Sequence, residues 1–235
     1  MVGIRAGCIA IWVLFLGACL CAEAADTEVR AGGIALTLPA PSSDFRESGD
    51  KLRTTVFELI VPSVNRLVSA WAPPQELAKL REGKASGGLD AYAMVEVLRQ
   101  LEYDDCTPEA FQQLLKSAGA STGELVGKAM EDMGKGATEE MNARLKSLGQ
   151  RSIEMNHPEN PGALFQRTDA YGFAALTTYK QGDRSVTMAT VTAVIRVRQK
   201  VLFAYIFRKY ESPDTVISIG KDLEVWADGI LMRKK

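Results

Sequence analysis

Three β-strand patterns follow one another near the C-terminal end of the chain and are separated by short turns. Residues 173–179 form the first pattern, and Gln181-Gly182-Asp183 follows as a hairpin turn. Residues 185–197 then alternate, with Val191, Ala193, Ile195 and Val197 on one side. After a second turn, residues 201–210 are apolar on both sides, which predicts a central strand that is covered on both faces. Tight turns between such strands indicate an antiparallel sheet.

An amphipathic helix is predicted after this sheet. Ser212-Pro213-Asp214 has the residue types that open a helix. An apolar stripe with i, i+3 and i+7 spacing then continues to the end of the chain and consists of Val216, Ile219, Leu223, Trp226 and Ile230. We therefore expect an α+β fold in which this C-terminal helix packs on an antiparallel sheet.

The first half of the chain after residue 24 predicts shorter elements. We expect a flexible polar lead over residues 25–32 and a domain that begins at residue 33. Strand patterns occupy residues 33–38, 65–72 and 92–101, and a short helix is predicted over residues 75–81. Residues 56–61 favour a short strand or a turn, and the Pro- and Asn-rich segment 156–162 favours a loop.

Between these two halves, residues 107–149 have a helical character. Thr107 is suited to an N-cap, Pro108 to the first helical position and Glu109 to the first turn. Apolar residues then recur at helical spacing from Phe111 to Leu148. The sequence thus predicts one α+β domain over residues 33–235, with a helical insert at 107–149.

The first 24 residues resemble a secretory signal peptide. Arg5 precedes an uncharged run over residues 8–21, and Ala22-Glu23-Ala24 has the small-x-small pattern of a signal peptidase site. The run is shorter than the ~20 residues that span a bilayer. We expect cleavage between Ala24 and Ala25, and a periplasmic or secreted protein.

A second interpretation uses the same segment. Phe15-Leu16-Gly17-Ala18-Cys19 is similar to a bacterial lipobox, in which the cysteine is lipidated and keeps the chain on a membrane. Membrane contact is expected only in that case. Cleavage before Ala25 and cleavage before Cys19 both remain open.

Few residues have the pattern of a catalytic or metal centre. His157 is the only histidine, and Cys106 is the only cysteine after the signal segment. The neighbouring Asp104 and Asp105 should raise the pKa of the Cys106 thiol, which disfavours a nucleophile. No Gly-x-Ser-x-Gly elbow or phosphate-binding glycine loop is present. We therefore assign no catalytic, cofactor-binding or metal residue and predict no cofactor.

The order of elements suggests a family. Leu36-Thr37-Leu38-Pro39 ends the opening strand, and Val201-Leu202-Phe203-Ala204-Tyr205 leads into the final helix with Trp226 and Ile230. Over residues 33–101 and 163–235 this arrangement resembles the PsbP-like and DcrB-like exported α+β proteins. The C-terminal half also looks like a class of bacterial exported proteins without a known role. The resemblance implies a non-catalytic accessory or stress-related role at an envelope and assigns no functional residues.

These observations favour an exported, non-catalytic protein that binds an envelope protein or a small ligand through its sheet face or its helical insert. A net charge of -1 disfavours nucleic-acid binding. Two alternatives remain: a lipoprotein subunit of an envelope assembly tethered through Cys19, and a hydrolase built on carboxylates. The oligomeric state is left open.

Overall fold

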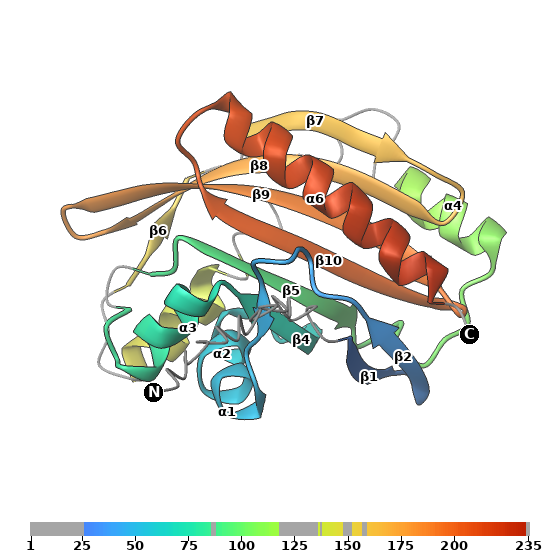
Figure 1. The fold of residues 1–235 in the computed structure, drawn as a ribbon, viewed down its shortest axis with the longest axis horizontal. Coiled ribbons are helices and arrows are strands. Elements are labelled where there is room, and N and C mark those ends of the chain that lie inside the picture. Colours follow the sequence, from blue (N-terminus) through green and yellow to red (C-terminus); the bar gives the residue numbers. More distant parts are fainter. Residues whose placement is uncertain are drawn as a thin grey trace, which may run out of the picture.

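An eight-stranded antiparallel sheet runs through the molecule (Figure 1). The computed structural model describes residues 26–85, 88–117, 136, 138–147, 152–156 and 159–233. The strand order is β3-β4-β5-β10-β9-β8-β6, and β7 also pairs with β8. The strands are β3 (Arg46–Glu47), β4 (Asn65–Ala72), β5 (Ala91–Leu98), β6 (Glu154–Met155), β7 (Glu159–Gln166), β8 (Ala170–Gln181), β9 (Arg184–Val197) and β10 (Lys200–Lys209).

Helices lie on both faces of this sheet. The described helical segments are α1 (Asp50–Leu52), the π-helical turn η1 (Arg53–Phe57), α2 (Glu58–Ile60), α3 (Pro74–Arg81), α4 (Pro108–Ser117) and α6 (Pro213–Met232). Residues 138–147 are also helical. The predicted α+β class, with an antiparallel sheet packed by a C-terminal helix, is confirmed.

The C-terminal helix α6 crosses one face of the sheet and forms the main core with it (Figure 1). Four residues of the predicted stripe are fully buried there, namely Ile219, Leu223, Trp226 and Ile230. They pack against the inward side chains of β9 and β10 and against Trp71 of β4. The helix begins as the sequence predicts, because Ser212 and Thr215 form a reciprocal capping box and Pro213 occupies its first turn.

The opposite face of the sheet is covered by smaller elements. Phe111 and Leu115 of α4 pack on Tyr171, Val194 and Val201. A separate cluster joins η1 and α3 to β4 and β5 and contains Phe57, Leu67, Leu77 and Met94 among its buried members. The prediction that the strand over 201–210 is central is confirmed, because β10 lies between β5 and β9. Its predicted cover is complete only on the α6 side, since Phe203, Tyr205 and Phe207 on the other face are half-buried.

Three local expectations were wrong. Residues 25–32 were expected to be flexible, but Thr27–Ala31 forms strand β1, which pairs with β2 (Ile34–Leu38) in a hairpin. Residues 56–61 are mainly helical, in η1 and α2. Phe57 is fully buried and packs in the cluster that joins η1 to β4 and α3. The expected loop over 156–162 runs into β7, which is an edge strand whose register shifts between Glu159 and Gly162. An edge strand with such an irregularity tolerates Pro and Gly.

The helical insert is described only in part. Residue Thr107 caps α4, since its hydroxyl accepts a hydrogen bond of 3.2 Å from the backbone N–H of Ala110. Helical structure is therefore confirmed at Pro108–Ser117 and at residues 138–147. Apart from Gly136, the remainder of the predicted insert lies outside the described residues.

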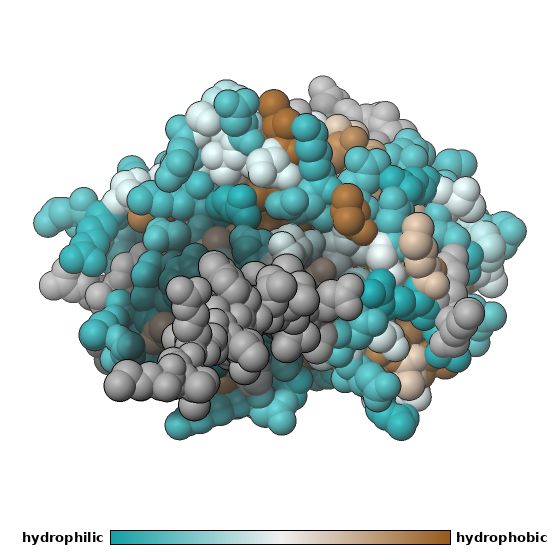
Figure 2. Space-filling view, viewed as in Figure 1, coloured by the Kyte–Doolittle hydropathy of each residue, from teal (hydrophilic) through white to brown (hydrophobic). Residues whose placement is uncertain are grey.

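The molecular face that carries α6 is mostly hydrophilic (Figure 2). Separate hydrophobic spots lie along the helix in that view. They agree with the exposure of three apolar side chains of α6 that point away from the core, Ile217, Val225 and Met232. The apolar surface on this side is scattered rather than gathered into one patch.

Candidate functional site

Four aromatic rings form a continuous series on the sheet face opposite α6. Tyr92 and Phe207 stack with their ring centroids 4.3 Å apart and an interplanar angle of 12°. Phe207 also lies 5.9 Å from Tyr205, and Tyr92 lies 6.1 Å from Phe57. The rings of Tyr92, Tyr205 and Phe207 are half-buried rather than enclosed. The series therefore presents aromatic surface from two adjacent strands.

Strand register brings a carboxyl group to this face. Tyr92 of β5 pairs with Phe207 of β10, and Glu96 of β5 pairs with Phe203. Because side chains alternate along a strand, residues 92, 94 and 96 share one face with residues 203, 205 and 207. Glu96 thus lies beside the aromatic series, with Tyr205 as its diagonal neighbour across the two strands.

Glu96 is a buried acid without a cationic partner in the described part of the chain. Its exposed fraction is 3%, and its polar partner there is Asn65, whose Nδ2 donates a hydrogen bond of 2.6 Å to Oε2. Burial raises the pKa of Glu96 to about 7, against the opposing effect of the Asn65 hydrogen bond. The Oδ1 atom of Asn65 is buried and accepts no hydrogen bond from the described residues. We call Asn65, Tyr92, Glu96, Tyr205 and Phe207 the Glu96 site.

The two tyrosines of the site, Tyr92 and Tyr205, also have raised pKa values. Burial raises the pKa of Tyr92 and of Tyr205 well above the ordinary value, and the charge of Glu96 raises both further. Burial raises the pKa of Tyr179 on β8 as well, and Tyr179 in turn affects Tyr92. The Glu96 site holds one buried polar atom without a partner in the described chain, Asn65 Oδ1, which a bound molecule would satisfy.

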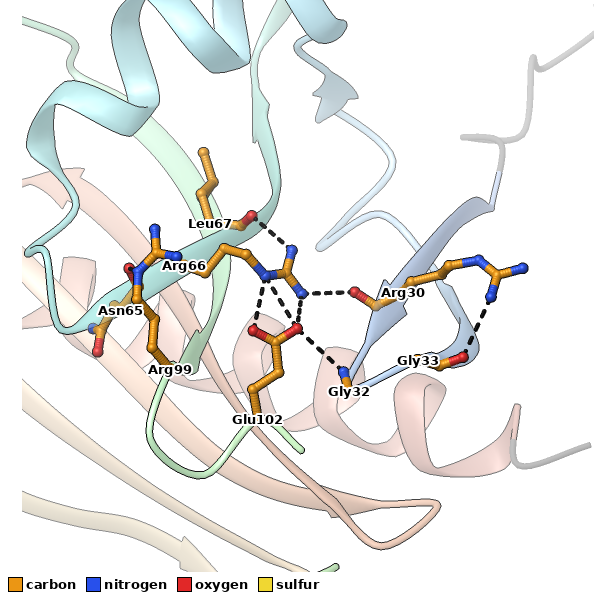
Figure 3. Close-up of polar contacts among 8 residues, drawn as sticks. All are labelled: Arg30, Gly32, Gly33, Asn65, Arg66, Leu67, Arg99 and Glu102. Carbon is orange, nitrogen blue, oxygen red and sulfur yellow. Dashed lines mark hydrogen bonds and ion pairs between the residues drawn. The ribbon is translucent and has the colours of Figure 1, made fainter. Parts of the chain in front are cut away.

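A second polar cluster joins the β1–β2 hairpin to the loop after β5 (Figure 3). Arg66 donates to both carboxylate oxygens of Glu102, with an ion-pair distance of 2.6 Å, and the backbone N–H of Gly32 donates to the same carboxylate at 3.2 Å. Arg66 also donates to the carbonyl of Arg30. The hydrogen bonds from Arg66 lower the pKa of Glu102. Because these charged groups are paired with one another, the role of the cluster is to hold the hairpin in place.

Lys200 holds the loop that follows β5 through hydrogen bonds to residues 103–105. Its side chain is 4% exposed, and Nζ donates to the carbonyls of Tyr103 and Asp104 at 3.1 Å and to Oδ1 of Asp105 at 3.0 Å. The predicted turn before β10 therefore ends in a buried lysine whose donors are all directed at one loop. This arrangement is structural, and it pairs the carboxylate of Asp105 with a cation.

The thiol of Cys106 behaves as the sequence indicates, although for another reason. Its pKa is raised, as predicted, but burial is the main cause, and Arg196 acts in the opposite direction and lowers the pKa. The expected effect of the neighbouring acids is not seen, and the carboxylate of Asp105 is occupied by Lys200. Cys106 is thus a half-buried free thiol.

The remaining residues singled out from the sequence fall outside this description. The predicted cleavage residues Ala24 and Ala25, the alternative lipidation residue Cys19 and the lone His157 lie outside the described residues. Among the residues that the structure describes, no group of three His, Cys, Asp or Glu side chains could hold a metal ion. No described helix is long and apolar enough to cross a membrane.

The Glu96 site was missed by sequence reasoning, although a signal for it exists. Glu96 stands in the alternating segment 92–101 on the same side as Tyr92, Met94 and Leu98. An acid within an otherwise apolar face is a sign of a buried polar group. Its neighbours on β10 could not be found in this way, because the pairing of β5 with β10 joins segments that lie far apart in the sequence.

Comparison with known proteins gives only distant structural likenesses. No family model and no curated protein matches the chain. The crystal structure of the Saccharomyces cerevisiae Ran-binding protein Mog1p is similar at 12% identity and a TM-score of 0.36, over 89% of this chain and 94% of that chain. The structure of a point mutant of Mog1 is similar at 13% identity and a TM-score of 0.34, over the same shares of both chains. Similarity at this level carries no functional inference.

Proposed function

We propose that this protein acts by binding a small ligand at the Glu96 site and does not catalyse a reaction. The observation that carries the proposal is the combination of half-buried rings with a buried polar atom, Asn65 Oδ1, that lacks a partner in the described chain. Natural proteins satisfy nearly all buried polar groups. The unsatisfied Oδ1 of Asn65 therefore favours a ligand that donates the missing hydrogen bond.

The composition of the site supports binding over turnover. Among the described residues, Glu96 contacts no second carboxylate or nucleophile, and its one hydrogen bond comes from an amide. Ligand pockets typically combine apolar and aromatic surface with a few polar groups that fix orientation. The rings of Tyr92, Tyr205 and Phe207 supply the aromatic surface, and Glu96 and Asn65 supply the polar groups that fix orientation.

Export is part of the same proposal. The signal-like segment over residues 1–24 supports a periplasmic or secreted protein in which the chain begins at Ala25. The lipobox-like segment ending in Cys19 supports the alternative of a tethered envelope subunit. The intact mass of the protein recovered from cells separates the two, since a chain that begins at Ala25 has no lipid and lacks Cys19.

Ligand binding is tested by two-dimensional amide NMR of the purified protein against a library of neutral, cationic and anionic small molecules. We expect ligands to shift amide signals of β4, β5 and β10 and to lose at least about tenfold in affinity in the variant Tyr205→Ala. Ile217→Ala, on the exposed side of α6, is the matched control and should leave binding unchanged. Shifts confined to other elements, or a turnover of library compounds that Glu96→Gln abolishes, would contradict the proposal.

A further inference from the structure

The unpaired charge of Glu96 sets it apart from two other buried acids. Glu76 is 3% exposed and pairs with Lys79 at 2.6 Å. Glu102 is 9% exposed and pairs with Arg66 at 2.6 Å. Glu96 is as buried as Glu76, but an amide is its partner and, in the described chain, no lysine or arginine pairs with it. A buried carboxylate without a cation is unfavourable, so the group either takes up a proton or pairs with a cation that comes from outside the chain.

The groups that face Glu96 are neutral on each described strand beside it. Asn65 and Leu67 face it from β4, and Phe203 and Tyr205 face it from β10. Along β5 itself, Tyr92 and Met94 share its face. The titratable groups in this set are tyrosines, which are uncharged at neutral pH, and burial raises the pKa of each further above its ordinary value. These strands thus offer a carboxyl group amid aromatic rings and supply no positive charge.

Aromatic rings beside a buried carboxylate form a recognisable chemical environment. The face of a phenol or phenyl ring carries partial negative charge and attracts ammonium groups, most strongly where water is excluded. Phe203 lies opposite Glu96 and Tyr205 lies diagonally beside it, whereas Tyr92 and Phe207 stack on each other two positions further along the same face. The ring faces and the Glu96 carboxylate both favour a positively charged ligand and disfavour an anion.

We propose that the ligand of the Glu96 site is an organic cation, whose ammonium group pairs with the Glu96 carboxylate while its apolar part lies on the neighbouring half-buried rings of Phe203 and Tyr205. This inference rests on the proposed binding function and adds the chemical class of the ligand. A neutral ligand would leave Glu96 protonated, whereas an ammonium ligand stabilises the carboxylate and displaces its proton. Binding of a cation below neutral pH is therefore accompanied by proton release.

Three matched probes test the ligand class. Tyramine, tyrosol and 4-hydroxyphenylacetate share one phenol ring and differ in carrying an ammonium, a hydroxyl or a carboxylate group. We expect tyramine to bind about tenfold more tightly than tyrosol, as measured by calorimetry, and 4-hydroxyphenylacetate to bind most weakly. Because the pKa of Glu96 in the free protein is raised to about 7, a pH-stat titration at pH 6 should record net proton release when tyramine binds.

Variants assign these effects to the site. Glu96→Gln keeps the shape of the side chain and should reduce the preference for tyramine over tyrosol to less than about twofold and abolish proton release. Glu28→Gln removes one charge from an exposed position of β1 and is the matched control, which should retain both effects. Circular dichroism spectra that match the unaltered protein establish that both variants are folded.

The outcomes separate the ligand class from the binding function. Equal affinity for tyramine and tyrosol, with shifted amide signals in β5 and β10, would overturn the cation inference and leave the proposed function intact. Tyramine binding that Glu96→Gln does not weaken would overturn it as well. If no probe binds while a neutral or anionic library compound does, the ligand class is wrong. If neither the probes nor the library bind, the proposed function fails too.

Discussion

Trp71 and Trp226 meet edge to face in the centre of the main core, with ring centroids 5.4 Å apart and planes inclined by 85°. Trp71 belongs to β4 and Trp226 to α6, so the contact joins the sheet directly to the helix that covers it. The two indoles differ in their polar atoms. Nε1 of Trp226 donates to the carbonyl of Pro39 at 2.7 Å, whereas Nε1 of Trp71 is buried and finds no acceptor among the described residues.

This difference predicts unequal costs for the same substitution. Trp226→Phe removes a hydrogen bond and leaves the Pro39 carbonyl without its donor, so the free energy of unfolding should fall by about 3 kcal/mol. Trp71→Phe removes an N–H that has no acceptor in the described chain, so the loss of unfolding free energy should be about 1 kcal/mol smaller. Urea unfolding of both variants measures the difference. A larger loss for Trp71→Phe would show that the bond to Pro39 contributes little.

Two adjacent glycines of the β1–β2 turn give a second contrast. Both have positive φ, +54° at Gly32 and +79° at Gly33. A Cβ atom at Gly32 would lie 1.9 Å from the carbonyl oxygen of Glu102, while a Cβ at Gly33 would meet nothing within 4 Å. Gly33→Ala should therefore cost about 1 kcal/mol of backbone strain, and Gly32→Ala at least about 3 kcal/mol. Thermal unfolding of the two variants provides the comparison, and similar melting temperatures would rule out the close packing at Gly32.

The ion pair of Glu102 with Arg66 predicts a loss of hairpin stability. Glu102→Ala leaves the guanidinium and the Gly32 N–H without their acceptor, so we expect a loss of about 3 kcal/mol and faster amide exchange over β1 and β2. Because the folded-state pKa of Glu102 is lowered, its contribution is present above the unfolded value and is lost as the pH falls through the folded pKa. Glu82→Ala is the control: its pair with Lys84 is exposed, and the change should stay within about 0.5 kcal/mol.

Glu96 predicts a pH dependence of the opposite sign. Its pKa is raised from 4.5 to about 7, so between these values the folded chain holds a proton that the unfolded chain has lost. The free energy of unfolding should therefore fall by about 3 kcal/mol as the pH rises through this window. Glu96→Gln should remove this effect, which is measured as the difference between the two proteins in urea unfolding on either side of the window. If the free energy of unfolding changed equally with pH in both proteins, Glu96 would not be the source of this pH dependence.

The turn between β9 and β10 offers a stabilising substitution. Arg198 and Gln199 both have positive φ, which strains residues other than glycine. The backbone carbonyl of Gln199 accepts a hydrogen bond from Cys106 N–H, and this contact needs no side chain. Gln199→Gly should therefore raise the free energy of unfolding by up to about 1 kcal/mol. Gln199→Ala retains the strain and serves as control, so equal gains in the two variants would contradict this explanation.

Periodic features of the sequence predicted the C-terminal half of the fold well. The stripe on α6, the alternation in β9 and the doubly apolar β10 each reflect burial that repeats along one element. Such repetition survives in a single sequence. The element at 56–61 was predicted wrongly because its helical character depends on placing Phe57 against β4 and Tyr92, which no local pattern records.

The candidate site was less predictable for the same physical reason. Glu96 is visible as an acid within an apolar face, but its burial, its raised pKa and its aromatic neighbours all arise from the pairing of β5 with β10. The lead at 25–32 was expected to be flexible because it is short and polar, yet Gly32 is held by a carboxylate 70 residues away. Contacts between distant segments decide both features.

The place of β10 in the sheet has a consequence for how the chain folds. β4 and β5 form a hairpin-like pair early in the chain, but their free edge and their apolar face await β10 and α6, the last two elements described. A chain that emerges N-terminus first therefore exposes an unpaired strand edge and Trp71 until residues 200–232 are available. High contact order of this kind slows folding. A slow-folding chain leaves the edge of β5 unpaired for longer, and during that time the edge is open to pairing with strands of other chains.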